Sequence, residues 1–348
     1  MKAYVLHDID DFRLEEAGMP VPKGHEVIVK VKAAGICGSD IPRIYRTGTY
    51  SFPLVPGHEF SGIVKTIGKD VDAKWKGKRV GIFPLIPCHS CKQCGNKQYE
   101  MCRHYSYLGS RTNGGFAEYV AVPEENLIEL PETVDYEQAA MLEPMAVAVH
   151  AMRKAKVQLE NTVAVCGLGT IGLLLCMFLL DLGVKNIYVI GNKEFQKQKI
   201  IEMGIPEKHY CDGNKVSVNE WLSMQTEGKG VDVFFECVGK KETICQAIEN
   251  TTPGGTVQLI GNPASDIELK KDIYWKILRN QLTVKGSWNS SFLHTREDDW
   301  HYVLHTLEQK KVRPEKFITQ RFSLEQLEQG LRIMRDKTEE YVKVMINL

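Results

Sequence analysis

The sequence predicts a mixed α/β protein in which a β-rich domain is interrupted by an inserted domain with a parallel sheet. Three observations support this fold class. Residues 1–125 contain short apolar runs separated by glycines, and strand-like and helix-like segments alternate from residue 162 onward. The chain ends in a strand-like run at residues 341–346. Short strands with frequent turns are typical of a barrel or sandwich, and alternating strands and helices are typical of a parallel sheet.

The domain boundaries follow from this change of pattern. We expect the β-rich domain to comprise residues 1–150 and 289–348, and the inserted domain to comprise residues 151–288. In the first domain, we expect a strand at residues 27–32 and helices at residues 136–157 and about 298–309. In the inserted domain, we expect strands at residues 162–166, 186–190, 231–237 and 256–260, and helices at residues 170–182 and 193–203.

The composition is that of an ordinary globular protein of about two domains. The chain has 348 residues, and its 44 basic residues balance its 44 acidic residues. Balanced charge gives no long-range attraction to nucleic acid or to an anionic membrane, so we expect neither as a partner. The uncharged stretch at residues 162–180 approaches the length of a membrane span, but three glycines divide it into a strand and a helix. Acidic residues soon after Met1 do not fit a signal peptide, so we expect a cytoplasmic protein.

Four of the ten cysteines have the spacing of a zinc site. They are Cys88, Cys91, Cys94 and Cys102. Zinc prefers four thiolates in a tetrahedron, and a tight turn with two intervening residues can present two sulfurs to one ion. Disulfides are not expected in a cytosolic chain, and an iron–sulfur cluster is the other group that four cysteines can hold. We expect a closed structural zinc site that takes no part in catalysis.

A glycine-rich loop follows the first strand of the inserted domain and opens a helix. Its residues are Gly167, Leu168, Gly169, Thr170, Ile171 and Gly172. In this context the first glycine allows a tight turn, the second lets a pyrophosphate approach the backbone, and the third lets the helix pack against the strand. The helix N-terminus then offers free N–H groups to the phosphates. The loop therefore predicts a dinucleotide site, with a purely structural glycine turn as the alternative.

The end of the second strand of this domain bears on the choice of cofactor. NAD sites normally have an acidic residue there, which accepts a hydrogen bond from the ribose 2′-hydroxyl. This chain has Gly191, Asn192 and Lys193 instead. The missing carboxylate and the nearby lysine favour the 2′-phosphate of NADP, so we expect a preference for NADP. NAD remains possible if Lys193 only begins a solvated helix.

A second set of metal-ligand types lies in the β-rich domain. Cys37 stands in the sequence Gly-Ile-Cys-Gly-Ser-Asp, and His58 and Glu59 are adjacent. Thiolate, imidazole and carboxylate groups all bind zinc, and a catalytic zinc site uses three protein ligands and leaves one position open. Either motif alone is a weak indication, because a lone cysteine is usually a buried core residue.

Together these motifs resemble the zinc-containing medium-chain dehydrogenases of the sorbitol dehydrogenase branch. The resemblance covers essentially the whole chain and rests on the four cysteines and on residues 35–40, 57–62, 114–119, 142–144, 167–172 and 236–239. It implies a GroES-like barrel domain and a Rossmann domain, with the active site in the cleft. It also implies two zinc ions per chain, hydride transfer between an alcohol carbon and a nicotinamide, and a homo-oligomer, either dimer or tetramer.

The resemblance also assigns roles to individual residues. The implied catalytic zinc ligands are Cys37, His58 and Glu143, with Glu59 a ligand in some states or close by. Asp40 is expected to orient His58, and Ser39 is expected to pass the substrate proton towards the cofactor ribose. Without the resemblance, Glu143 would be interpreted as a first-turn helix carboxylate and Ser39 as a turn residue. Further cofactor contacts are expected from Val238 and Gly261.

Two departures from sorbitol dehydrogenases concern the substrate. Those enzymes have a histidine soon after the Cys-Gly-Ser-Asp motif, where this chain has residues 41–43, and a substrate-binding arginine after Gly286, where this chain has none. A further resemblance, to members that act on sugar-alcohol phosphates, lies in residues 37–44, 109–119 and 286–288. We therefore expect a small-molecule substrate that is a polyol phosphate or ketose phosphate, with Arg43 at the phosphate and Arg111 as a weaker candidate.

Three other functions fit parts of the pattern. One is a dehydrogenase of an unphosphorylated polyol or secondary alcohol, like the sorbitol and threonine dehydrogenases. Another is a non-enzymatic zinc-ribbon binding module built around the four cysteines. The third is a zinc-free quinone reductase of the same superfamily, which lacks the catalytic ligand set and would bind no zinc.

Overall fold

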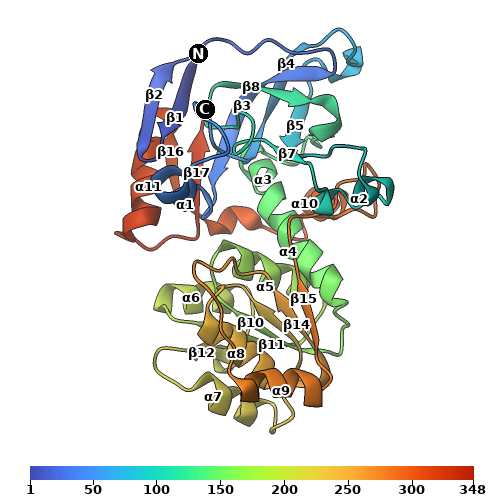
Figure 1. Ribbon diagram of the computed structural model, residues 1–348, viewed down its shortest axis with the longest axis vertical. Coiled ribbons are helices and arrows are strands. Elements are labelled where there is room, and N and C mark those ends of the chain that lie inside the picture. Colours follow the sequence, from blue (N-terminus) through green and yellow to red (C-terminus); the bar gives the residue numbers. More distant parts are fainter. The chain divides into compact units, whose positions relative to one another are not determined.

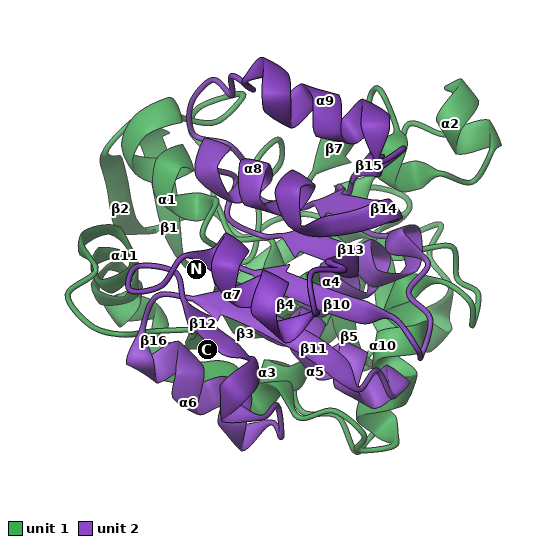
Figure 2. Cartoon of the chain, turned by 90° about the horizontal axis from the view of Figure 1, so that it is seen from below, with its two compact units in different colours: residues 1–144, 291–348 green, residues 145–290 purple.

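The computed structural model describes residues 1–348, which fold into two compact units. Unit 1 comprises residues 1–144 and 291–348, and unit 2 comprises residues 145–290. Figure 1 labels the helices and strands, and Figure 2 distinguishes the two units by colour. Unit 1 thus contains both ends of the chain.

Unit 1 is built around a seven-stranded sheet. Its strands follow the order β16-β17-β3-β4-β5-β9, and β8 pairs with β3. Val27, Val29 and Val31 alternate along β3 and belong to one hydrophobic core, because alternate side chains of a strand point to the same face. The strands of this sheet are β3 (Glu26–Ile36), β4 (Glu59–Ile67), β5 (Arg79–Ile82), β8 (Tyr119–Pro123), β9 (Leu127–Glu129), β16 (Ile318–Ser323) and β17 (Lys343–Asn347).

Shorter elements complete unit 1. Leu327 and Leu331 of α11 add one helix face to the same core. Two small antiparallel pairs are β1 (Lys2–Asp8) with β2 (Asp11–Glu16), and β6 (Leu85–Ile86) with β7 (Ser106–Tyr107). The helices are α1 (Asp40–Pro42), α2 (Lys92–Gly95), α3 (Tyr136–Ala140), α10 (Asp299–Glu308) and α11 (Leu327–Asp336), and the short helical turns are η1 (Arg43–Thr47), η2 (Ala73–Trp75), η3 (Tyr99–Met101), η4 (Glu124–Asn126), η6 (Pro314–Phe317) and η7 (Leu324–Gln326).

Unit 2 contains the parallel sheet that the alternation of strands and helices predicts. The strand order β12-β11-β10-β13-β14-β15 is that of a Rossmann fold, and the order reverses between β10 and β13. All pairings in this sheet are parallel. The strands are β10 (Thr162–Cys166), β11 (Asn186–Gly191), β12 (Tyr210–Asp212), β13 (Val231–Glu236), β14 (Thr251–Leu259) and β15 (Thr283–Gly286).

Helices lie on both faces of this sheet (Figure 2), with α5 and α6 on one face and α7, α8 and α9 on the other. They are α5 (Thr170–Leu182), α6 (Glu194–Glu202), α7 (Val218–Gln225), α8 (Lys241–Asn250) and α9 (Lys271–Arg279), with the turn η5 (Glu207–His209) before β12. No helix combines the length and the apolar character needed to cross a bilayer.

The predicted helix at residues 136–157 is interrupted. The chain forms α3, which ends at Ala140 with Met141 as its C-cap, and then α4 (Leu142–Ala155). Pro144 explains the break, because proline has no N–H and fits a helix only in its first turn. The new helix start places Glu143 in the first turn of α4.

Candidate active site and dinucleotide site

The ends of three strands of unit 1 meet at one place. β3 and β4 are antiparallel with Gly35 opposite Glu59, and β17 is antiparallel to β3 with Val344 opposite Ile36. The end of β3 therefore lies beside the starts of β4 and β17. This register brings Cys37, His58 and Lys343 together although they are far apart in the sequence.

Cys37, His58 and Glu59 form a cluster that fits a metal ion. One ligand atom from each lies within 4.8 Å of those from the other two, and His58 and Glu59 are buried. Gly35 leaves room for the Glu59 carboxyl group, because a Cβ at this position would lie 2.3 Å from Oε2 of Glu59. Thiol, imidazole and carboxyl groups at this spacing are a suitable donor set for zinc.

Asp40 connects this cluster to its surroundings. Its carboxylate accepts hydrogen bonds from the backbone N–H of Cys37 at 3.0 Å and from the Arg43 guanidinium at 2.5 Å, and its Oδ1 lies 3.4 Å from Nδ1 of His58. Burial raises the pKa of Asp40, but His58 and Arg43 outweigh this effect and the pKa lies below its usual value. A carboxylate beside a metal-binding histidine fixes the ring orientation, which is the role that we predict for Asp40.

The electrostatics of the cluster favour a bound cation. Burial lowers the pKa of His58, but the negative groups of Asp40 and Cys37 raise it well above its usual value. A potential that attracts a proton to this imidazole also attracts a metal ion. The electrostatics and the donor set therefore both fit zinc.

A buried ion pair that the sequence analysis missed holds Glu59. Nζ of Lys343 donates to Oε2 of Glu59 at 2.5 Å and to the carbonyl of Ile36 at 3.1 Å, and only 2% of the lysine side chain is exposed. The only sequence signal was a lysine within an apolar strand, between Val342 and Val344. Because buried charges need partners, this pair compensates the charge of Glu59.

Glu143 is buried beside the cluster but lies outside the close set of three. Oε1 of Glu143 accepts a hydrogen bond from the Tyr107 hydroxyl at 3.3 Å. Burial and, to a smaller extent, the charge of Glu59 raise the pKa of Glu143 to about 7, although His58 and Lys343 oppose this shift. The ring of Tyr107 lies 5.8 Å from that of His58. Sequence analysis did not identify Tyr107, because a single tyrosine in a two-residue strand carries no pattern.

The other predicted residues of this site have different surroundings. The hydroxyl of Ser39 donates to Sγ of Cys37 at 3.3 Å. Arg43 is 18% exposed and is paired with Asp40. Cζ of Arg111 lies 3.8 Å from the ring centre of Tyr50 and 4.5 Å from that of Tyr105.

The four-cysteine group fits a second zinc ion. The sulfur–sulfur distances are 3.9 Å for Cys88 and Cys94, 3.6 Å for Cys91 and Cys94, and 3.9 Å for Cys91 and Cys102. Sulfurs at the corners of a tetrahedron with zinc–sulfur bonds of about 2.3 Å lie about 3.8 Å apart. All four thiols are free, and Cys94 and Cys102 are buried. The distances therefore suit a closed tetrahedral site.

The glycine loop of unit 2 has the geometry of a dinucleotide site. Gly167 has a φ of +97°, and a Cβ at Gly172 would lie 1.9 Å from the carbonyl oxygen of Gly167. Gly169 caps α5, and a Cβ there would meet nothing within 4 Å. The first and third glycines are thus needed by the fold, whereas the second leaves open space at a helix N-terminus.

The remaining predicted cofactor residues lie at or just after the ends of neighbouring strands. Gly191 ends β11, and a Cβ there would lie 2.9–3.0 Å from atoms of Gln196, Leu168 and Tyr210. The turn at Val238 is held by the buried Glu236, whose Oε1 accepts from Val238 N and Gly239 N at 2.8 Å. A Cβ at Gly261 would lie 2.0 Å from Gly239 N, so these two segments pack closely.

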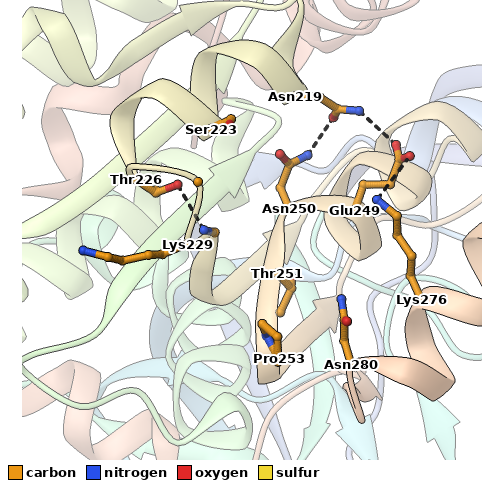
Figure 3. Close-up of a pocket in the computed structure, with 12 residues that line it drawn as sticks. Asn219, Ser223, Thr226, Lys229, Glu249, Asn250, Thr251, Pro253, Lys276 and Asn280 are labelled. Carbon is orange, nitrogen blue, oxygen red and sulfur yellow. Dashed lines mark hydrogen bonds and ion pairs between the residues drawn. The ribbon is translucent and has the colours of Figure 1, made fainter.

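A polar cavity of about 270 Å³ in unit 2 contains none of these residues (Figure 3). It is lined by Asn219, Lys229, Glu249, Asn250 and Lys276, among others. On its wall, Gly230 directly precedes β13 and Thr251 begins β14. The cavity therefore lies at the amino-terminal ends of the parallel strands, opposite the glycine loop. Ligands of such sheets bind at the opposite ends of the strands, beyond their carboxyl termini.

Comparison with known proteins identifies the family of both domains. Residues 23–132 match the family model of the alcohol dehydrogenase GroES-like domain, and residues 170–309 match that of the zinc-binding dehydrogenases. Galactitol 1-phosphate 5-dehydrogenase of Escherichia coli (strain K12) is 33% identical over 331 residues, which cover 94% of this chain and 95% of the relative. Sorbitol dehydrogenase of Halalkalibacterium halodurans is 31% identical, with 99% of both chains covered.

Solved structures show the same fold. The crystal structure of galactitol-1-phosphate dehydrogenase from Escherichia coli matches with a TM-score of 0.92 and 32% identity, and 100% of both chains are covered. Two further dehydrogenases match with TM-scores of 0.91 over 100% of this chain and 99% of theirs. One, from Sinorhizobium meliloti 1021, is bound to NADP and is 28% identical, and the other, from Escherichia coli CFT073, is complexed with NADH and is 27% identical. The predicted combination of a GroES-like domain and a Rossmann domain is therefore confirmed.

Proposed function

Because this chain belongs to the zinc-dependent medium-chain alcohol dehydrogenases, we propose that it transfers hydride between a nicotinamide cofactor and a polyol phosphate or its ketose phosphate. This membership excludes the zinc-ribbon binding module. The donor set of Cys37, His58 and Glu59 argues against the zinc-free quinone reductase, which lacks the catalytic ligand set. What remains to be assigned is the substrate, the cofactor preference and the role of each site residue.

We assign the catalytic zinc to Cys37, His58 and Glu143, with Glu59 as a nearby or alternative ligand, and a structural zinc to the four-cysteine group. When bound, zinc supplies a Lewis acid and the nicotinamide supplies a hydride acceptor. Asp40 holds the ring of His58 in place. Ser39, whose hydroxyl lies 3.3 Å from Sγ of Cys37, would accept the proton that leaves the substrate hydroxyl and pass its own hydroxyl proton on towards the cofactor ribose.

The observation that carries the phosphate assignment is the presence of two arginines close to this cluster, in a chain that is 33% identical to a polyol-phosphate dehydrogenase. Arg43 is joined to Asp40, and Arg111 contacts Tyr105, whose ring packs against Tyr107 beside His58. A guanidinium stays charged at any working pH and can bind a phosphate through two parallel hydrogen bonds.

The test compares galactitol 1-phosphate with galactitol, and sorbitol 6-phosphate with sorbitol, in the zinc-loaded enzyme. A charged hydrogen bond contributes about 1.5–3 kcal/mol, so kcat/KM should be roughly 10- to 150-fold higher for the phosphates. Equal kcat/KM values for phosphorylated and free polyols would refute the proposal.

A second candidate is a dehydrogenase of an unphosphorylated polyol or secondary alcohol. The pairing of Arg43 with the buried Asp40 favours it, because that carboxylate already compensates the charge of this arginine. Sorbitol dehydrogenase is 31% identical to the chain. Higher kcat/KM for sorbitol, butanediol or threonine than for any polyol phosphate would support this second candidate.

For the cofactor, we propose a preference for NADP. The supporting observation is that Gly191 ends β11 without a carboxylate, while the side chain of Lys193 has no hydrogen-bond or ion-pair partner. Lys193→Gln should lower kcat/KM for NADP and leave that for NAD nearly unchanged. This variant tests the preference better than Gly191→Asp, because a Cβ at position 191 would crowd Leu168 and Tyr210. Equal kcat/KM values for NAD and NADP in the unaltered enzyme would contradict the proposed preference for NADP.

A further inference from the structure

We propose that Arg111, held against Tyr50 and Tyr105, binds the substrate phosphate, and that Arg43 does not. This inference rests on the proposed phosphorylated substrate and specifies where its phosphate binds. It reverses the ranking that the sequence suggests, in which Arg43 is the stronger candidate. The two arginines differ in their charge partners, their available donors and their position.

The charge of Arg43 is already paired within the protein. Its guanidinium donates to Oδ1 of Asp40 at 2.5 Å, and that carboxylate is completely buried. Oδ1 of Asp40 also lies 3.4 Å from Nδ1 of His58. If Arg43 moved to a phosphate, it would leave a buried carboxylate with one charge partner fewer, which is costly. The geometry therefore makes Arg43 a positioning residue that acts on His58 through Asp40.

Arg111 is held by aromatic rings and has no acidic partner. Its Cζ lies 3.8 Å from the ring centre of Tyr50 and 4.5 Å from that of Tyr105, distances that require the guanidinium to lie over the ring faces. No side-chain or carbonyl oxygen accepts a hydrogen bond from this guanidinium, and Nε is buried without a partner. The Nη1 and Nη2 groups also have no acceptor within the protein and are not among the buried atoms, so their N–H donors remain available. An unpaired and pre-oriented set of donors is what a phosphate requires.

The position of Arg111 relative to the metal cluster is fixed by a tight turn. The backbone N–H of Arg111 donates to the carbonyl of Tyr107 at 2.9 Å. The Tyr105 ring lies 6.2 Å from the Tyr107 ring, which in turn lies 5.8 Å from the ring of His58. One short segment thus carries the phosphate donors, while Tyr107 at its start contacts His58 and Glu143. The guanidinium of Arg111 and the metal cluster are thus separated by the rings of Tyr105 and Tyr107. An extended polyol phosphate that reacts at the end away from its phosphate fits this arrangement.

The experiment measures the ratio of kcat/KM for galactitol 1-phosphate to that for galactitol in four proteins: the unaltered enzyme, Arg111→Gln, Arg43→Gln and Arg46→Gln. Arg46 is an exposed arginine close to Arg43 in the sequence and serves as the matched control. Arg111→Gln should lower the ratio by about 10- to 150-fold, because it removes a charged contact that only the phosphate makes. Arg43→Gln should lower kcat/KM for both substrates in parallel, and Arg46→Gln should change neither.

A second readout does not depend on turnover of either polyol. Inorganic phosphate should inhibit the unaltered enzyme competitively against galactitol 1-phosphate, and Arg111→Gln should weaken this inhibition while zinc content and melting temperature stay unchanged. Tyr105→Leu should weaken it as well, whereas Tyr105→Phe, which keeps a ring face, should retain most of it. Loss of the phosphate preference in Arg43→Gln but not in Arg111→Gln would overturn this inference and leave the proposed function standing. An unaltered enzyme without any phosphate preference would overturn both.

Discussion

At the scale of single residues, the candidate active site is a set of charges that hold one another in place. Asp40 is shared by the backbone of Cys37, by Arg43 and by His58, and Glu59 is paired with Lys343. Removing one member would leave a buried charge without its partner, which costs more than the pair itself contributes. Substitutions at Asp40 or Lys343 therefore report on the whole cluster rather than on one contact.

The glycine loop allows a sharper test at single positions. Gly172→Ala should destabilise unit 2, because its Cβ would lie 1.9 Å from the carbonyl oxygen of Gly167. Gly169→Ala should leave the melting temperature within about 1 °C, because its Cβ would meet nothing within 4 Å and its φ of −77° suits alanine. The same methyl group would occupy the space that we assign to the pyrophosphate, so Gly169→Ala should weaken NADPH binding at least 10-fold.

Thermal unfolding and a fluorescence titration with NADPH measure the two effects. Gly169→Ala with full NADPH affinity would contradict the assignment of the loop to the pyrophosphate.

At the scale of elements, the four-cysteine segment depends on its metal. The segment from β6 to β7 contains only α2, η3 and short strands, so little regular structure holds it. Cys94→Ser should remove one zinc ion per chain and lower the melting temperature, because structural zinc contributes directly to the free energy of folding. Cys245→Ser is the thiol control, since Cys245 of α8 belongs to no metal cluster, and should keep the full zinc content. Metal analysis of the two purified variants decides the matter, and an undiminished zinc content in Cys94→Ser would refute the structural site.

The start of α10 provides a prediction about pH. Asp298 is buried and caps this helix, and it accepts hydrogen bonds from the backbone N–H and Nδ1 of His301 at 2.8 and 2.9 Å and from Leu293 N at 2.8 Å. Burial raises the pKa of Asp298, but these hydrogen bonds lower it below its usual value. Because the folded pKa is the lower one, the stabilisation is complete above the unfolded value of about 3.9 and is lost as the pH falls through the folded value.

Asp298→Asn should therefore lower the free energy of unfolding by about 1–2 kcal/mol at pH 7. The difference from the unaltered protein should shrink as the pH falls below about 4. Urea unfolding across this pH range measures it, with the exposed Asp266→Asn as the control. A difference that stays constant down to pH 3 would show that the charge of Asp298 does not stabilise the helix start.

At the scale of the whole molecule, the chemistry is divided between the two units. All proposed zinc ligands belong to unit 1, and the glycine loop and its neighbouring strand ends belong to unit 2. His58→Ala should therefore lose one of two zinc ions and all turnover, yet bind NADPH with unchanged affinity. The exposed His25→Ala should retain both zinc ions and full activity. Near-normal turnover in His58→Ala would refute the catalytic zinc assignment.

The sequence by itself determined the features that depend on local spacing. The cysteine group, the glycine loop and the helix after it were predictable, because neighbouring residues in a tight turn or at a strand end are brought together by local geometry alone. The strands and helices around the loop were predicted within a few residues: α5 begins and ends at the predicted positions, while β14 begins five residues earlier than predicted, at Thr251. The long predicted helix was wrong at Met141, where Pro144 forces a restart.

Only the tertiary structure decided how the charged groups of the site are paired. Lys343 reaches Glu59, 284 residues away in the sequence, because β17 and β4 both pair with β3. Arg43 pairs with Asp40 three residues before it, within one helical turn, whereas folding places Arg111 on two tyrosine rings without an acid. Sequence patterns record which residue types are present, but the partner of a charged side chain depends on strand register and burial. Those two properties arise only when distant segments pack together.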